Sequence, residues 1–158
     1  MTKTALLLTF FCFSITISIA QNALNFDGST DYVQTNSPGV TGTNNRTFEA
    51  WVYVSSNAPL SNLCIIDYGT NALGSRNTFM VAGNRALSFI SGGTNANISS
   101  NANDVPADTW VHVAFVLNSG TGYLYRNGVQ VGTGSQTSVN TPTGNQYVIV
   151  GQRVSGGS

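Results

Sequence analysis

The stretch that decides the fold reads Trp110-Val-His-Val-Ala-Phe-Val-Leu-Asn-Ser-Gly-Thr-Gly-Tyr-Leu-Tyr-Arg-Asn-Gly-Val-Gln-Val-Gly132. It predicts two β-hairpins in series, because runs rich in Val and Tyr are separated by turns that contain Gly. The pair Asn127-Gly128 predicts a two-residue type I′ turn. That turn needs positive φ at both central positions, which Asn and Gly adopt most easily.

The turn also predicts how the residues on either side of it pair. Counting outward, the expected pairs are Arg126 with Val129, Tyr125 with Gln130, Leu124 with Val131 and Tyr123 with Gly132. Side chains alternate between the two faces of a strand, so one face carries Leu124, Val129 and Val131. The other face carries Tyr123, Tyr125 and Gln130, and these three become candidate ligand contacts if the face is open to solvent.

The composition predicts one neutral domain. The chain has 158 residues, of which 41% are hydrophobic and only 8% charged, and six basic residues balance six acidic ones. This length is typical of a single domain with a sizeable core. No basic patch is present that would neutralise phosphates, so we expect no nucleic-acid partner. Few charges among many Thr, Ser, Asn and Gly residues are typical of an extracellular β protein.

The first 20 residues are expected to be a secretory signal peptide. Lys3 precedes an uncharged apolar run that ends in Ser18-Ile-Ala20, which is the pattern that signal peptidase cleaves. The alternative is a membrane anchor, but the run is shorter than the roughly 20 residues that a span needs. We therefore expect a secreted or cell-surface domain at residues 21–158, with no membrane insertion after the leader is removed. Cys64 is then the only cysteine left, which predicts a packed thiol and no disulfide.

The rest of the chain predicts an all-β fold with very little helix. Short apolar or alternating runs are separated by clusters of Gly, Asn, Ser, Thr and Pro, and no run keeps a helical period. The expected strands before the hairpins are Ala23–Phe26, Tyr32–Thr35, Thr47–Val54, Leu63–Tyr68, Thr78–Ala82 and Ala86–Ile90. Residues 92–104 are polar and aperiodic, which predicts a long surface loop. Many short strands of this kind are typical of an antiparallel sandwich or jelly roll.

Two strands lack a polar face. Phe48-Glu-Ala-Trp-Val-Tyr-Val54 carries Trp51 and Tyr53 opposite its apolar side, and Trp110–Leu117 carries His112 opposite its own. The pattern predicts that the first strand is either largely covered on both sides or lines a groove with one of them, and that the second is buried on both sides. Trp51 is then either a packed core indole or a platform that stacks on sugar rings. His112, the only histidine, is expected to be a hydrogen-bonded core imidazole.

The loop Asn25-Phe-Asp-Gly-Ser-Thr-Asp-Tyr-Val33 offers two acidic side chains. Asp27 and Asp31 are four residues apart beside a glycine, so both are candidate ligands for Ca²⁺. The spacing differs from that of an EF-hand, which needs several more oxygen ligands. The alternative is that the aspartates only cap an Asx turn.

Three motifs in order resemble the laminin-G-like, concanavalin-A-like jelly-roll family. They are Leu24-Asn-Phe-Asp-Gly-Ser-Thr-Asp-Tyr-Val33, Thr47-Phe-Glu-Ala-Trp-Val52, and Asp108-Thr-Trp-Val-His-Val-Ala114 followed by Tyr125-Arg-Asn-Gly-Val129. The resemblance implies two antiparallel sheets of about six or seven strands each, packed face to face. It also implies a non-catalytic module that binds glycans or extracellular proteins, with Ca²⁺ in some members. The family's closing strand has no counterpart before Ser158, so we expect a domain that lacks it.

Three functions follow from the resemblance. The first is a secreted recognition module for a carbohydrate or an extracellular protein, with Trp51, Tyr53, Tyr123, Tyr125 and Gln130 as candidate ligand contacts. The second is an accessory domain or remnant of a secreted glycoside hydrolase. Hydrolysis needs two carboxyl groups about 5 to 9.5 Å apart, and Glu49 is the one Glu, so we expect no catalysis in these residues. The third is an adhesive spacer whose aromatic residues all lie in the core.

Overall fold

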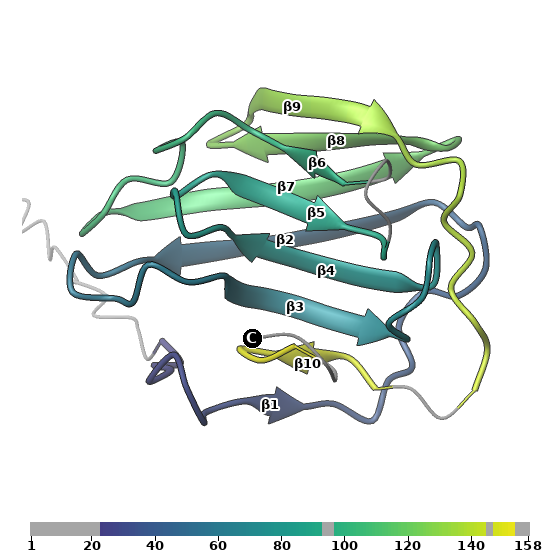
Figure 1. Cartoon of the computed structure of the whole chain (residues 1–158), viewed down its shortest axis with the longest axis horizontal. Helices are drawn as coiled ribbons and strands as arrows, with labels where there is room; N and C mark the ends of the chain where they lie inside the picture. The colour runs from purple at the N-terminus through teal and green to yellow at the C-terminus, as the bar shows by residue number, and fades with distance from the viewer. Residues whose placement is uncertain (1–22, 93–96, 145–146, 154–158) are drawn as a thin grey trace, which may run out of the picture.

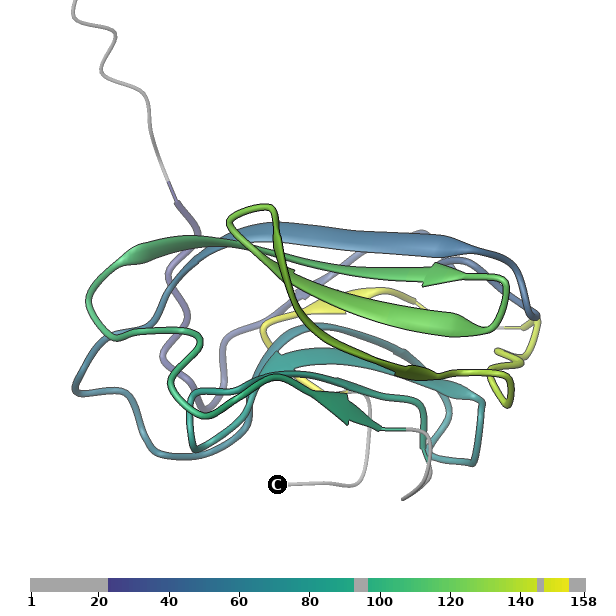
Figure 2. The same cartoon turned by 90° about the horizontal axis from the view of Figure 1, so that it is seen from above.

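The computed structural model describes residues 23–92, 97–144 and 147–153. These residues form a sandwich of two antiparallel sheets and contain no helix (Figure 1 and Figure 2). The predicted all-β sandwich is therefore confirmed. The predicted signal peptide, residues 1–20, lies outside the described residues. In the part of the chain that is described, no helix is long and apolar enough to cross a membrane.

One sheet has six strands and faces the viewer in Figure 1. Its order across the sheet is β1, β10, β3, β4, β5 and β6. The bounds of these strands are Val33–Gln34, Ile149–Val150, Leu63–Gly69, Arg76–Val81, Leu87–Ile90 and Ile98–Ser99.

The other sheet has four strands and lies behind the first in Figure 1, as the second layer seen in Figure 2. Its order is β2, β7, β8 and β9, with bounds Arg46–Tyr53, Trp110–Asn118, Thr121–Arg126 and Val129–Ser135. The family resemblance implied about six or seven strands in each sheet, and for this sheet that expectation is wrong.

Most predicted strands are present. One predicted strand is absent, and one strand, β6, lies where a loop was predicted. Residues 23–26 form no strand. The region predicted as a surface loop contains β6, where Ile98 pairs with Phe89 and is buried. A two-residue strand is too short to show a period, so its apolar residue gave no usable signal.

The Asn-Gly turn forms as predicted, but the pairing beyond it shifts by one residue. Asn127 and Gly128 both have positive φ, at 49° and 79°. Arg126 pairs with Val129 and Tyr125 with Gln130, after which a bulge pairs Leu124 with Gly132 and Tyr123 with Thr133. The predicted partners of Leu124 and Tyr123 are therefore wrong.

Close packing against β6 accounts for the bulge. The shift turns Gly132 and Gly134 toward the inside of the sandwich, opposite Leu124 and Gly122. A Cβ atom at Gly134 would overlap with Cγ2 of Ile98, so only glycine fits there.

The core between the sheets is built on aromatic rings. Phe89 of the six-stranded sheet stacks on Phe115 of the four-stranded sheet, with ring centroids 3.7 Å apart and planes 7° apart. Phe48 packs on both rings, and Tyr68 meets Phe48 edge to face. This cluster fixes which face of β2 and which face of β7 point inward.

Arg46 holds one end of the sandwich together from inside. Its side chain is buried, and Nη1 donates to the oxygens of Tyr68, Asn77 and Thr141. Nη2 and Nε donate to backbone carbonyl groups in the loop just before β2. One guanidinium thus joins both sheets and two loops through neutral acceptors, which satisfies the buried charge by hydrogen bonding.

The loop from Asp27 to Asp31 is closed by its own carboxylates. Asp27 accepts hydrogen bonds from the hydroxyl and amide of Thr30 and from the amides of Ser29 and Asp31. Asp31 accepts one from the amide of Asp27. The Thr30 hydroxyl contributes most, followed by the three amides, and together they hold the pKa of Asp27 well below its usual value of 3.8.

We predict that Arg46→Met destabilises the domain by about 3 kcal/mol, because it leaves buried acceptors on the six-stranded sheet and in two loops without a donor. Urea unfolding of both proteins measures the difference. Thr47→Ala, at the exposed neighbouring position on β2, should change stability by less than about 0.5 kcal/mol. An unchanged midpoint for Arg46→Met would show that the network contributes nothing.

We predict that the Asp27 loop loosens only in strong acid. Because folding lowers the pKa of Asp27, the stabilisation is fully present above the carboxyl's ordinary pKa and is lost as pH falls toward the folded-state value. The amide resonance of Thr30, followed by NMR from about pH 6 to about pH 1.5, should titrate far below the usual range for Asp. Asp27→Asn should abolish the transition, and Ser29→Ala should leave it in place. A transition at the ordinary value would contradict the prediction.

Candidate functional site

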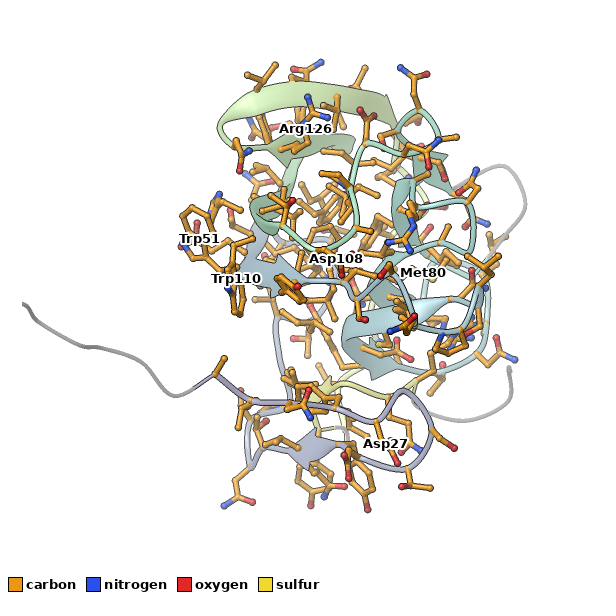
Figure 3. All side chains as sticks on the ribbon, turned by 90° about the vertical axis from the view of Figure 1, so that its left-hand side faces the viewer. Asp27, Trp51, Met80, Asp108, Trp110 and Arg126 are labelled. Atoms are coloured by element: carbon orange, nitrogen blue, oxygen red, sulfur yellow. The ribbon has the colours of Figure 1, made fainter. Side chains whose placement is uncertain are left out.

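Three large aromatic side chains project from the outer face of the four-stranded sheet. Trp51 is 65% exposed, Trp110 50% and Tyr53 48%. They occupy the outward positions of β2 and β7, while Phe48 and Phe115 fill the inward positions. The prediction that β7 is buried on both sides is therefore wrong. Of the two arrangements predicted for β2, the fully covered one is excluded, and Trp51 is not a core indole. Figure 3 shows Trp51 and Trp110 side by side, pointing away from the body of the molecule.

Pairing between β2 and β7 brings these side chains into two rows. Tyr53 lies opposite Trp110, with ring centroids 5.6 Å apart, and Trp51 lies opposite His112, with centroids 5.5 Å apart. We call Trp51, Tyr53, Trp110 and His112 the aromatic face. The prediction of His112 as a core imidazole is wrong, because its side chain is 29% exposed and sits against the indole of Trp51.

A shallow, open depression of about 490 Å³ lies on this face. It is lined by Trp51, Trp110, His112 and Asn127. The hairpin turn positions Asn127. Its side-chain Oδ1 accepts from the backbone amide of His112, and its backbone amide donates to the carbonyl of His112. The turn residue that fixes the hairpin thus also forms one wall of the depression.

Two carboxylates border the aromatic face. Glu49 lies next to Trp51 on β2 and places Oε2 3.7 Å from Nε2 of His112. Asp108 accepts from the amide of Ser56 at 2.9 Å and from the hydroxyl of Tyr53 at 3.5 Å. The hydrogen bonds from Ser56 are the main reason that the pKa of Asp108 is lowered. Asp108 therefore orders the end of β2 beside Tyr53.

No arginine or lysine among the described residues projects from this face. Arg46 is buried, and Arg126 points to the inner side, where it pairs with Asp104 at 3.2 Å. Arg76 is buried beside Asp67 on the six-stranded sheet, at 3.1 Å. Arg153 follows a strand of that same sheet, and Arg85 lies at the end of the sandwich, where its Nη2 donates to the carbonyl of Ser55 just after β2 and its charge acts on Asp108. The outer face of the four-stranded sheet thus carries acceptors and aromatic rings but no permanent positive charge.

The predicted contacts Tyr123, Tyr125 and Gln130 lie on the same outer face but outside the depression. Tyr125 pairs with Ala114 on one side and Gln130 on the other, and Tyr123 pairs with Val116. Both tyrosines are half-buried, whereas Gln130 is exposed. The small side chain of Ala114 separates Tyr125 from Glu49.

The sequence interpretation missed Trp110 and Asn127. The alternation on β7 already placed Trp110 on the same side as His112, and the Asn-Gly turn was recognised. What was lacking was the pairing of β7 with β2, which sets Trp110 beside Tyr53 and Asn127 beside His112.

Asp27 and Asp31 use their carboxylates to close their own loop, which is the arrangement that the Asx-turn alternative predicts. Across residues 23–92, 97–144 and 147–153, no group of three or more His, Cys, Asp or Glu side chains is placed to hold a metal ion. The structure therefore adds no further ligand to the proposed Ca²⁺ pair.

Cys64 is a packed thiol, as the sequence predicts. Its Sγ donates to the carbonyl of Gln152 at 3.3 Å. Burial, reinforced by the negative charge of Asp67, raises the pKa of Cys64 to about 12. The thiol is thus held neutral and is a poor nucleophile.

Comparison with known proteins agrees with the fold. A laminin G-type family profile, described as the concanavalin A-like lectin/glucanases superfamily, matches residues 27–158. A search of curated proteins found no match. The matched range includes all ten strands and every residue of the aromatic face. The chain therefore belongs to the concanavalin A-like lectin/glucanase superfamily.

Proposed function

We propose that this protein is a secreted, non-catalytic recognition module that binds carbohydrate on its aromatic face. The observation that carries the proposal is the pair of exposed indoles, Trp51 and Trp110, which line an open depression together with His112 and Asn127. Membership of the superfamily supports binding of carbohydrate or protein in general. The extracellular location typical of such domains agrees with the predicted leader.

The chemistry of the face suits a sugar. Exposed aromatic rings leave apolar area in water, and the C–H face of a pyranose covers that area while its hydroxyl groups remain at the edge. Polar groups lie beside the rings, where the Glu49 carboxylate can accept and the side-chain NH2 of Asn127 can donate, while Asn127 Oδ1 is engaged by the amide of His112. A ligand that is apolar on its faces and polar on its rim matches this layout.

The same face supports binding without hydrolysis. Glycoside hydrolysis normally uses a pair of carboxyl groups about 5 to 9.5 Å apart on either side of the scissile bond. Glu49 is the carboxyl group beside Trp51, and Asp108 is engaged by the amide of Ser56 at the end of β2. Neither has a second carboxylate across the depression, whose walls are Trp51, Trp110, His112 and Asn127.

An adhesive spacer would place its aromatic residues in the core, whereas Trp51, Tyr53 and Trp110 are exposed. An extracellular protein partner is the alternative ligand, because exposed aromatic residues are also common at protein interfaces. The polar rim of acceptors around an open depression favours the sugar.

We predict that Trp51→Ala and Trp110→Ala each weaken binding to a recognised polysaccharide roughly tenfold, as expected from the loss of one stacked ring. Affinity gel electrophoresis against a panel of polysaccharides identifies the ligand, and isothermal titration then measures each variant. Both side chains are exposed, so the variants should keep the wild-type unfolding midpoint.

Leu73→Ala is the matched control, because Leu73 is 66% exposed but lies in the loop after β3, on the other sheet. It should bind as the wild type does. Equal binding by all three variants would place the ligand site elsewhere, and a folded domain that binds no glycan would contradict the carbohydrate proposal.

A further inference from the structure

Resting on the proposed function, we propose that the aromatic face binds the interior of an extended, uncharged polysaccharide chain, which crosses the strands of the four-stranded sheet. Charged glycans and single terminal sugars are the ligand classes that this proposal excludes. Three observations carry it: the charge of the face, the openness of the depression, and the row of side chains beside it.

Charge selects a neutral ligand. The outer face of the four-stranded sheet, within the described residues, presents Glu49 and no arginine or lysine. Sulfated or uronic acid chains are usually held by Arg or Lys through charge-assisted hydrogen bonds. Here such a chain would meet Glu49 without a compensating cation. An uncharged sugar instead donates hydrogen bonds from its hydroxyl groups to Glu49 and is not repelled by it.

The shape of the depression selects the interior of a chain. A terminal sugar is typically recognised in an enclosed pocket, which buries most of the ligand. This depression is open, and Trp51 and Trp110, which line it, project away from the body of the molecule. Across the strands, Tyr53 lies opposite Trp110 with ring centroids 5.6 Å apart. Neighbouring rings of a chain that crosses the strands can therefore each meet an aromatic side chain.

A row of paired residues lies beside the depression. Glu49, Ala114, Tyr125 and Gln130 face one another across β2, β7, β8 and β9. Three steps between strands span about 14 Å, which is long enough for several sugar rings. Ala114 is buried, so the side chains on either side of it form the surface at that position. The ring of Tyr125 and the amide of Gln130 then provide a second stacking and hydrogen-bonding position.

The test uses neutral and charged glycans of defined length. Isothermal titration of the whole chain with β-1,4- and β-1,3-linked glucan oligosaccharides of two to six units reports the effect of length. Heparin and polygalacturonate serve as the anionic probes. We expect affinity to rise about tenfold from the disaccharide to the hexasaccharide of the preferred linkage, the gain from one more stacked ring. We also expect no change with salt and no binding of either anionic probe.

Two variants separate the positions along the row. Tyr125→Ala should weaken hexasaccharide binding about tenfold while leaving disaccharide binding within about twofold, because the short ligand stays at the tryptophans. Trp51→Ala should weaken both. Val129→Ala is the matched control, since Val129 is 63% exposed on the same hairpin but is turned to the opposite side. It should change neither affinity.

The outcomes distinguish this inference from the function on which it rests. Equal affinity for short and long oligosaccharides, or salt-sensitive binding of heparin that Trp51→Ala removes, would overturn the inference and leave carbohydrate recognition standing. Binding of no glycan by the folded protein would overturn both.

Discussion

The contact on which the rest of the structure depends is the stack of Phe89 on Phe115, with Phe48 packed against both. It joins the two sheets, and it requires one set of alternating side chains on β2 and on β7 to point into the core. Because side chains alternate along a strand, that requirement forces Trp51, Tyr53, Trp110 and His112 to the other side. No third layer covers these side chains within the described residues, so the packing that stabilises the sandwich also creates the exposed aromatic face.

The sequence allowed much of this fold to be predicted, and the reason is local. Asn127-Gly128 predicts its own turn, and alternation along β2 and β7 predicts which residues share a face. The exposure of Trp51 could not be predicted in this way, because a strand with apolar residues on both faces looks the same whether its second face is covered or open. Only the arrangement of the layers distinguishes the two cases.

The same limit applies to the pairing of β8 with β9. Counting from the turn is correct for two pairs and fails at the bulge beyond Tyr125. The bulge turns Gly132 and Gly134 toward β6, where Ile98 leaves no room for a side chain. That contact joins residues far apart in the chain, so nothing near the turn signals it. Tyr123 and Tyr125 nevertheless keep their predicted face, since the shift lies on the β9 side of the ladder.

The aromatic face lacks positive charge because the arginine side chains form their contacts elsewhere in the fold. Arg46 and Arg76 are buried and fully engaged with acceptors inside the protein, and Arg126 pairs with Asp104 on the inner side. The positive charges that stabilise the sandwich are therefore withheld from the surface that bears Trp51 and Trp110. Recognition on that surface must rely on dispersion, burial of apolar area and hydrogen bonds, which act at short range and depend on the shape of the ligand. Such a surface distinguishes its ligands by the stereochemistry of their hydroxyl groups and by chain length, and attraction between opposite charges contributes little.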